Sequence, residues 1–274
     1  MHAHYAAPAG DAVLRARAGT PMVVSTHGGD VLGVVEGWPR LGAPAVRRAL
    51  GAATLVLANS AGIEERCRRL GATATRVVHL GTDLPAQLSP PSPDPHLVTV
   101  GDLVERKRHA DVLDALGRLR ESHPGLRWVV VGDGPQRAGL ERRATELGLR
   151  DRVDFRGALA PADALAAARA GAVFVLPSVD EAFGVAYVEA MAGGVPAVGC
   201  AGEPGPEEIA ACGAGLSRVP PRDPLALAHE LARLLDDAGA RRAQGDAARV
   251  TVARHFTWER CGAETVAAYS DALR

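Results

Sequence analysis

Short apolar runs rich in Val and Leu alternate with longer stretches of mixed polarity along almost the whole chain. Apolar runs bounded by turn residues are typical of strands buried on both faces, and the stretches between them have helical length. This alternation predicts βαβ units, with parallel strands and helices on both faces of a sheet. We expect strands over residues 21–26, 54–58, 75–79, 96–100, 126–131, 152–155, 173–176, 195–199 and 215–219.

The ends of some helices can also be read from the sequence. Ser60 can cap a helix that ends at Gly71. A second helix is expected over about 111–121, and the chain after Asp223 is expected to be mostly helical. Strands and helices therefore alternate as in doubly wound α/β domains.

A proline-rich stretch divides the pattern into two unequal parts. Four prolines within residues 89–95 cannot lie in a helix or a central strand, so this stretch predicts a linker. About three strands precede the linker and about six follow it. The first ten residues show no strand pattern and read as a loop entered in mid-domain, so a first segment is expected to be absent. We predict a partial N-terminal Rossmann-like domain over 1–88, a complete domain over 96–255 and a C-terminal segment over 256–274.

Composition and charge exclude several classes of protein. The formal net charge of −1 creates no field that attracts polyanions, and an aromatic content of 4% argues against a module that stacks nucleic-acid bases. The four cysteines lack the spacing of a zinc site and fit a reducing cytoplasm. No apolar run is long enough to span a bilayer, although peripheral contact with its inner face stays open. We expect a cytoplasmic protein that does not bind nucleic acid.

The most informative stretch is residues 177–196, where a strand ends, a loop carries Glu181 and a helix begins near Gly184. A helix N-terminus can bind an anion because its unpaired N–H groups point outward. Glu189 lies about one turn further along and could bond neutral hydroxyls. A diphosphate at the helix start and a ribose at the carboxylate would hold a nucleotide sugar. Taken alone, isolated glutamates at such positions are more often an exposed loop acid and a helix-surface glutamate.

A resemblance to a known family changes that balance. Glu181 and Glu189 enclose seven residues. With Phe183-Gly184 inside, this spacing resembles the E-x7-E motif of retaining GT-B glycosyltransferases, above all family 4. In that family the first glutamate lies near the donor sugar and the second binds the ribose. The resemblance implies the GT-B type of α/β fold, with two Rossmann-like doubly wound parallel-sheet domains facing a cleft and, here, an incomplete N-terminal domain. It also implies a donor site without a metal or another cofactor.

A second segment resembles the family part that contacts the donor diphosphate. Residues 100–107 match it, which assigns the diphosphate contact to Lys107, with Arg106 beside it. Taken alone, a loop lysine is normally just solvated. The family often has an arginine where this chain has Asp102, and a partly buried carboxylate there would repel diphosphate by on the order of a few kcal/mol. Either Asp102 points away, or Arg106 or Arg108 compensates, or donor binding is impaired.

Further matches follow in the order of the family. Residues 155–158 resemble a loop near the nucleotide base, which implicates Gly157, and Val185 joins Gly184 at the helix start. His27 directly follows a strand, where ligands of open α/β sheets bind. Its segment resembles the His-Gly-x-Asp stretch whose histidine contacts the donor sugar. For Asp30, a helix N-cap is an equally good reading.

The other histidines are expected to play smaller parts. His2 and His4 match a family loop and are expected to be structural, whereas His109, His123 and His255 are expected to be solvated. The resemblance runs from the opening residues to the Phe-Thr-Trp of residues 256–258. It implies that the C-terminal segment is a helix that packs back on the N-terminal domain.

The resemblance implies transfer of a hexosyl group from a nucleotide diphosphate sugar to a hydroxyl of a saccharide, lipid-linked or small-molecule acceptor, with retention of anomeric configuration. Two alternatives stay open: a non-catalytic nucleotide-sugar-binding subunit or remnant, and a GT-B-shaped nucleotide-sugar epimerase. A partner chain or a second copy would cover an incomplete first domain. The expected catalytic residues are His27, Lys107 and Glu181, and the expected donor-binding residues are Arg106, Gly157, Phe183, Gly184, Val185 and Glu189.

Overall fold

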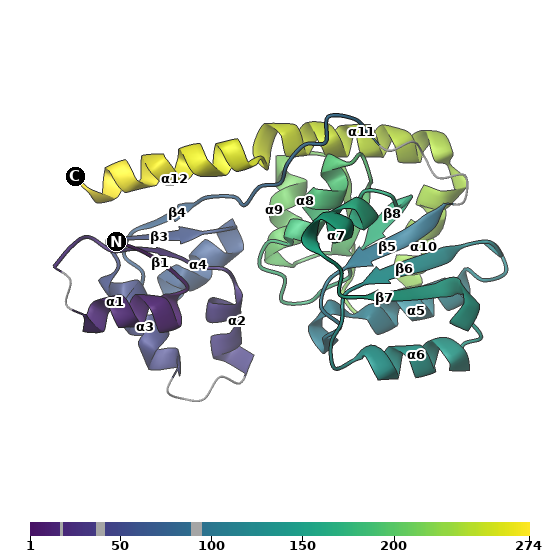
Figure 1. The fold of residues 1–274 in the computed structure, drawn as a ribbon, viewed down its shortest axis with the longest axis horizontal. Helices are drawn as coiled ribbons and strands as arrows, with labels where there is room; N and C mark the ends of the chain where they lie inside the picture. Colours follow the sequence, from purple (N-terminus) through teal and green to yellow (C-terminus); the bar gives the residue numbers. More distant parts are fainter. Residues whose placement is uncertain (17–18, 37–41, 89–94) are drawn as a thin grey trace. The chain divides into compact units, whose positions relative to one another are not determined.

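The computed structural model describes residues 1–16, 19–36, 42–88 and 95–274. The chain forms two compact units (Figure 1). Unit 1 comprises Met1–Gly81, Asp180–Phe183 and Phe256–Arg274, and unit 2 comprises Thr82–Val179 and Gly184–His255. The predicted proline-rich linker lies, except for Pro95, outside the described residues.

Unit 1 contains a parallel sheet whose described strands have the order β1-β2-β3-β4 (Figure 1). The three expected strands are confirmed. The expectation of a loop at the start of the chain was wrong, because β1 pairs with β2 in the register His2↔Val23. Two of the three residues of β1 are histidines, so this strand follows from pairing with its neighbour rather than from local propensity. The strands are β1 (His2–His4), β2 (Val23–Ser25), β3 (Leu55–Ala58) and β4 (Thr75–Val77).

Helices cover both faces of this sheet. One core joins Val24 and Val56 to Leu50 on α3, and a second joins Val23 and Leu57 to α12 (Trp258–Ala272). The predicted cap of α4 is confirmed, since the Ser60 hydroxyl accepts a hydrogen bond from the Ile63 N–H at 3.3 Å. The remaining elements of unit 1 are η1 (Ala6–Gly10), α1 (Asp11–Arg15), α2 (Gly29–Glu36), α3 (Gly42–Ala52) and α4 (Ala61–Arg69).

Unit 2 contains a six-stranded parallel sheet in the order β10-β9-β8-β5-β6-β7 (Figure 1). All six expected strands are confirmed, with ends shifted by a residue or two. The strand order reverses between β5 and β8, and such a switch point is where doubly wound sheets bind ligands beyond the carboxyl ends of their strands. The strands are β5 (His96–Val100), β6 (Arg127–Val131), β7 (Val153–Gly157), β8 (Val173–Val175), β9 (Ala197–Cys200) and β10 (Leu216–Val219).

The helices of unit 2 pack on a core that includes the fully buried Trp128 and Leu97. Burying each large apolar side chain of this kind contributes roughly 1.5–3 kcal/mol. Helix α5 starts at His109 and ends at Arg118, slightly earlier than predicted. The others are η2 (Glu105–Lys107), α6 (Arg137–Glu146), η3 (Arg150–Arg152), α7 (Pro161–Ala168), α8 (Val185–Ala192), α9 (Pro204–Cys212), α10 (Pro224–Asp236) and α11 (Ala238–His255).

The turn after β6 fixes the course of the loop after β5. A β-carbon on Gly132 would lie 2.0 Å from the carbonyl oxygen of Gly101, and one on Gly134 would lie 2.7 Å from that of Leu103. Both glycines also have positive φ, which other residues adopt at a cost. The two loops can approach so closely only with glycine at these positions. The segment that leads to Lys107 is thereby held against the turn.

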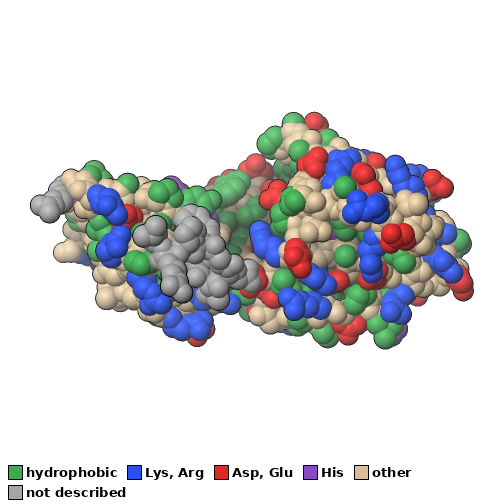
Figure 2. Space-filling view, turned by 90° about the horizontal axis from the view of Figure 1, so that it is seen from below, with side chains coloured by type: hydrophobic (Ala, Val, Ile, Leu, Met, Phe, Trp, Pro, Cys, Tyr) green, Lys and Arg blue, Asp and Glu red, His purple; other side chains and the backbone are tan. Residues whose placement is uncertain are grey.

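No helix in the described part of the chain combines the length and apolar character needed to cross a bilayer. On the face of unit 2 seen in Figure 2, acidic and basic side chains are interspersed rather than gathered by sign.

Candidate active site

The first candidate residue, Lys107, lies on the connection that follows β5. It is the last residue of η2, and its N–H donates to the Val104 carbonyl at 3.1 Å. A β-carbon on Gly101 would lie 4.0 Å from Cε of Lys107, so the half-buried lysine stem passes over the carboxyl end of β5. Lys107 is also the only lysine among 31 basic residues. This signal could have been read from the sequence alone, because a compact ammonium and a planar guanidinium are not interchangeable.

The loop after β8 joins this connection. The Val179 N–H donates to the Arg106 carbonyl at 2.8 Å, which ties the two loops together beside the switch point. Ser178 precedes this contact, and its fully buried hydroxyl has no hydrogen-bond partner. A buried polar atom without a partner is uncommon in folded proteins. Sequence reasoning passed over Ser178, since no pattern distinguishes it from an ordinary loop serine.

Helix α8 begins at the end of the same loop. Gly184 is its N-cap and has φ 84°, and Val185 is its first residue. The buried Tyr187 hydroxyl donates to the Leu176 carbonyl and so anchors the first turn to the end of β8. The N–H groups of a first helical turn lack partners within the helix and carry a partial positive charge. An anion at the carboxyl end of β8 would meet these groups.

Glu189 lies within α8 and is half-buried. Burial raises the pKa of its carboxyl above the ordinary value, and the nearby Arg169 opposes this effect. Arg169 is held in place by donating from Nε to the backbone carbonyl of Glu189 at 3.2 Å and also to the Asp83 carbonyl. A carboxylate in this position can accept hydrogen bonds from two neighbouring hydroxyls.

Gly157 ends β7, two strands away from β5 in the sheet. It has φ 72°, and its carbonyl accepts a hydrogen bond from the Gly132 N–H at 2.8 Å. Arg137 donates to the neighbouring Phe155 carbonyl at 3.2 Å. The loop after β7 is therefore joined to the turn after β6, on the same carboxyl side of the sheet as Lys107.

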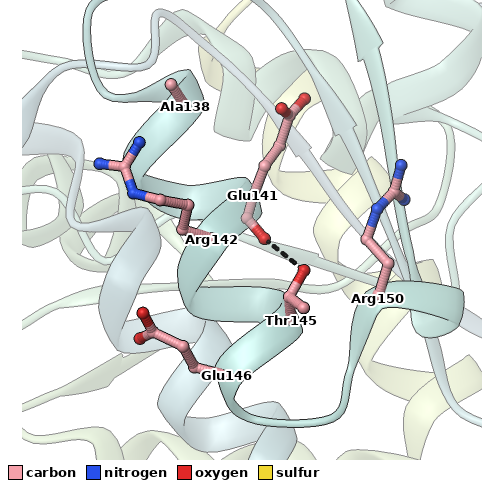
Figure 3. Close-up of a pocket in the computed structure, with 6 residues that line it drawn as sticks. All are labelled: Ala138, Glu141, Arg142, Thr145, Glu146 and Arg150. Atoms are coloured by element: carbon pink, nitrogen blue, oxygen red, sulfur yellow. Dashed lines mark hydrogen bonds between the residues drawn. The ribbon is translucent and has the colours of Figure 1, made fainter.

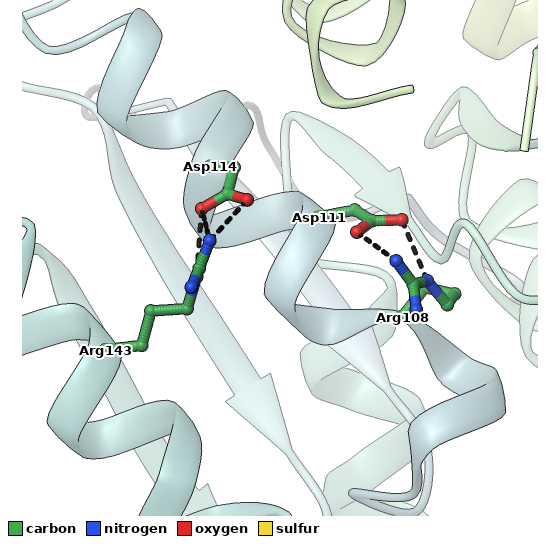
Figure 4. Close-up of polar contacts among 4 residues, drawn as sticks. All are labelled: Arg108, Asp111, Asp114 and Arg143. Carbon is green, nitrogen blue, oxygen red and sulfur yellow. Dashed lines mark hydrogen bonds and ion pairs between the residues drawn. The ribbon is translucent and has the colours of Figure 1, made fainter. Parts of the chain in front are cut away.

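The structure bears on whether the carboxylate of Asp102 would repel a bound diphosphate. Its side chain is exposed, and a charge pair 4 Å apart in water interacts by only about 1 kcal/mol. Arg108 has a left-handed backbone, and its guanidinium makes two hydrogen bonds to Asp111, of 2.7 and 3.0 Å (Figure 4). Arg143 makes a similar pair with Asp114 nearby (Figure 4). Because the Arg108 guanidinium already pairs with Asp111, it is not available to offset the negative charge of Asp102.

His27 lies in unit 1, in the loop after β2. Its Nε2 is 3.0 Å from Nδ1 of His4, and its ring lies against that of Tyr5 at a centroid distance of 4.7 Å. Burial lowers the pKa of the His27 imidazole below its ordinary value; Asp30 opposes this effect and His4 strengthens it. The imidazole is therefore neutral at pH 7, and it can donate from one ring nitrogen and accept at the other.

Asp30 fixes the loops around this histidine. Its two carboxylate oxygens accept from the Ala6 N–H at 2.9 Å and from the His27 N–H at 3.1 Å. The carboxylate is buried, so these two bonds replace water. Asp30 lies in the first turn of α2 and not at its N-cap, and its carboxylate joins the loop after β1 to the loop after β2.

Glu181 and Phe183 also belong to unit 1, although they come from the connection after β8. Both are buried, and the Phe183 ring packs between His79 and Phe256 at centroid distances of 6.1 and 5.6 Å. The Ser60 hydroxyl donates to the Ala182 carbonyl at 2.7 Å. This segment is therefore held against the end of β3 and the helix that follows it.

One histidine contradicts its predicted place. His109 was expected to be solvated but is 2% exposed, and neither ring nitrogen has a hydrogen-bond partner. It begins α5 with its ring 6.2 Å from that of Trp128. The prediction was wrong because a polar residue at a helix start gave no sign that the first turn faces the core.

Other candidate sites in the described residues are less suited to a ligand. An open depression of about 520 Å³ on α6 is lined by side chains of both signs, among them Glu141, Arg142 and Arg150 (Figure 3). Ligand pockets are usually concave and largely apolar. Nowhere in the described part of the chain do three or more His, Cys, Asp or Glu residues form a group that could hold a metal ion.

The two parallel sheets define a doubly wound α/β protein with a candidate site at the switch point of unit 2. The model of the family "Glycosyl transferases group 1" matches residues 82–251, and that of "Glycosyltransferase Family 4" matches residues 1–85. The chain belongs to the glycosyl transferases group 1 family, and it is a GT-B glycosyltransferase by fold.

Three relatives illustrate the range of the similarity. An exopolysaccharide phosphotransferase of Streptomyces coelicolor is 33% identical over 215 residues, which are 75% of this chain and 22% of the relative. Sucrose-phosphate synthase of Thermosynechococcus elongatus is 25% identical with a TM-score of 0.86, covering 98% of this chain and 72% of that one. Anabaena HepE in complex with UDP-glucose shares the fold at 23% identity and a TM-score of 0.83, covering 95% and 75%. The chain spans 22% to 43% of the length of the first curated relatives.

Proposed function

We propose that this protein transfers a hexosyl group from a nucleotide diphosphate sugar to a hydroxyl, with retention of anomeric configuration. One observation carries the proposal. The loops after β5 and β8, which flank the switch point, are hydrogen-bonded to each other through Arg106 and Val179. One loop supplies the lysine and the other leads to the start of α8. Two sources of positive charge are thus supplied from adjacent strands.

In this proposal the diphosphate binds at Lys107 and at the first turn of α8. When the glycosidic bond to the diphosphate breaks, negative charge grows on the departing oxygen, and fixed positive groups lower the barrier most at that moment. The ammonium and the N–H groups of Gly184 and Val185 would provide this stabilisation without a metal. Arg106 would add positive charge beside the phosphates.

The other donor contacts follow from the chemistry of each group. The Glu189 carboxylate would accept from the two ribose hydroxyls, and the loop at Gly157 would lie along the base. Glu181 and the neutral His27 imidazole would orient the donor sugar. The Phe183 ring is packed against His79 and Phe256, so Phe183 would contribute through its backbone. The acceptor hydroxyl would attack from the face that the diphosphate leaves, with the diphosphate helping to take its proton.

A binding subunit without turnover is the second candidate, since Asp102 places a carboxylate in the segment proposed to meet the diphosphate. Product analysis separates the candidates. Incubation with UDP-glucose, GDP-mannose or ADP-glucose and a mixture of hydroxylated acceptors is expected to give a glycoside with the anomeric configuration of the donor. An inverted product would contradict retention. An isomerised donor without any transfer would indicate an epimerase, and nucleotide binding without either product would indicate the subunit.

A further inference from the structure

One arginine outside the predicted site residues contacts the residue proposed to bind the ribose. Arg169 is the C-cap of α7, and its Nε donates to the backbone carbonyl of Glu189 at 3.2 Å. Its Nη2 donates to the Asp83 carbonyl and to Oγ1 of Thr82, the latter at 3.4 Å. A single planar guanidinium therefore holds both α8 and the segment that begins unit 2.

The end of α8 shows what this contact supplies. The last four carbonyls of a helix lack partners within the helix, and in α8 they start with that of Glu189. Two of the others accept from N–H groups that directly follow the helix. The Glu189 carbonyl accepts from Arg169 instead. The backbone of the proposed ribose ligand is thus fixed by a side chain from α7.

The arginine itself has little freedom to move. A β-carbon on Gly193 would lie 2.6 Å from Cγ of Arg169, so only glycine leaves room for the arginine stem at this turn. Burial lowers the pKa of the Arg169 guanidinium, Glu189 and Asp83 oppose this effect, and Arg249 strengthens it. An arginine nevertheless stays protonated in proteins. Arg169 is therefore a fixed positive charge beside α8.

This charge acts on a carboxylate whose ionised form is disfavoured by its surroundings. Burial raises the pKa of the Glu189 carboxyl, and Arg169 opposes the effect. An ionised carboxylate accepts hydrogen bonds at both oxygens, whereas a protonated one carries a hydrogen on one of them. Two neighbouring hydroxyls are therefore bound best when Glu189 is ionised.

We propose that Arg169 is a positioning residue for ribose recognition, which fixes the backbone of Glu189 and keeps its carboxylate ionised beside the two ribose hydroxyls. In this role Arg169 acts through Glu189 and does not contact the nucleotide. The inference rests on the proposed function, because it takes Glu189 as the ribose ligand.

The test compares nucleotides with and without the ribose hydroxyls. UDP, GDP and ADP are titrated into the full chain by calorimetry, each beside its 2′,3′-dideoxy counterpart, which keeps the diphosphate. The ribose form of the accepted nucleotide is expected to bind about tenfold more tightly or better, since hydrogen bonds to a charged acceptor are strong. Arg169→Gln is expected to lower this ratio at least about threefold. A general loss of structure would weaken both forms alike, so an unchanged ratio would overturn the proposal.

Arg249 provides the matched control. It lies on α11 and donates to the carbonyls of Ala192 and Pro85, both at 2.9 Å. It therefore joins α8 to the same segment as Arg169 does, but at the last residue of the helix. Arg249→Gln is expected to leave the ratio unchanged. If it lowered the ratio as much as Arg169→Gln, loosening of α8 would explain the effect and the specific role of Arg169 would be refuted.

The pH dependence of the same ratio tests the role of charge. Without Arg169 the pKa of Glu189 rises further, because burial remains and the opposing charge is lost. Selectivity for the ribose form is present above this pKa and is lost as the pH falls through it. Its midpoint is therefore expected at higher pH in Arg169→Gln than in the unaltered protein or Arg249→Gln. Protonation of the diphosphate cancels, since both nucleotides carry it. A midpoint that stays in place would contradict the proposal.

The results separate this role from the proposed function. Nucleotide binding whose ratio is independent of Arg169 would overturn the positioning role and leave the proposed function intact. If the folded, unaltered chain bound none of the three nucleotides, the proposed donor site would be refuted, and the role of Arg169 with it.

Discussion

Lys107→Ala is expected to lower donor turnover by about 100-fold or more, and to weaken nucleoside diphosphate binding with it. Removing one group that stabilises developing charge typically costs on the order of 3 kcal/mol in the transition state. The half-buried stem of Lys107 lies over the end of β5. Because Lys107 is the only lysine in the chain, no second lysine can replace its ammonium group. Steady-state kinetics with the accepted donor measure the effect.

Two variants control this experiment. Arg118→Ala removes one positive charge from an exposed position of α5 in the same unit and is expected to change turnover less than twofold. Lys107→Arg keeps the charge but replaces the ammonium by a planar guanidinium, so partial recovery is expected. If Lys107→Ala and Arg118→Ala had equal activity, the diphosphate role of Lys107 would be refuted.

The second large effect concerns the stability of unit 2. Burial lowers the pKa of His109 to about 4, from 6.5 in an ordinary environment, and Lys107 adds to the effect. Between pH 4 and pH 6.5, His109 is therefore protonated in the unfolded chain but neutral in the folded chain. The folded state keeps its full stability above pH 6.5, and the contribution linked to His109 is lost as the pH falls from 6.5 to about 4. The shift corresponds to about 3 kcal/mol in the free energy of unfolding.

Substitution at this position should remove the pH dependence. Between pH 7 and pH 4, the free energy of unfolding of His109→Leu is expected to fall by about 3 kcal/mol less than that of the unaltered protein. At pH 7 it should be at least as stable, because two ring nitrogens without partners are removed. Chemical denaturation at a series of pH values measures both. His229→Leu, at an exposed position of α10, is the matched control and should keep the original pH dependence. An unchanged pH dependence in His109→Leu would show that another group is responsible.

The sequence was a good guide to the fold where local pattern and tertiary structure agree. Strands β6, β8 and β9 of unit 2 are nearly continuous apolar runs, so burial on both faces marked them in the sequence. Strand β1 was missed because its histidines are stabilised by partners far along the chain: His2 bonds Ser25 and Tyr269. His109 was misjudged for a related reason, since only the packing of α5 against Trp128 decides which side of its first turn is buried.

The candidate site divides in the same way. Lys107, Gly184 and Glu189 were picked out by motif and spacing, and the structure adds the hydrogen bond that joins their two loops. Ser178 and Arg169 could not be found by pattern. The first is distinguished by a buried polar atom without a partner and the second by carbonyl partners far along the chain, and both properties depend on neighbours in space. Their roles, like those of the other site residues, stay predictions that binding experiments can decide.

The most direct measurement is calorimetric titration of the purified chain with UDP, GDP and ADP, repeated on Glu189→Ala and on Lys107→Ala. The account predicts micromolar binding of one nucleotide and its loss in both variants, because one variant removes the ribose contact and the other the phosphate contact. A well-folded sample that binds none of the three nucleotides would contradict a donor site at the switch point between β5 and β8.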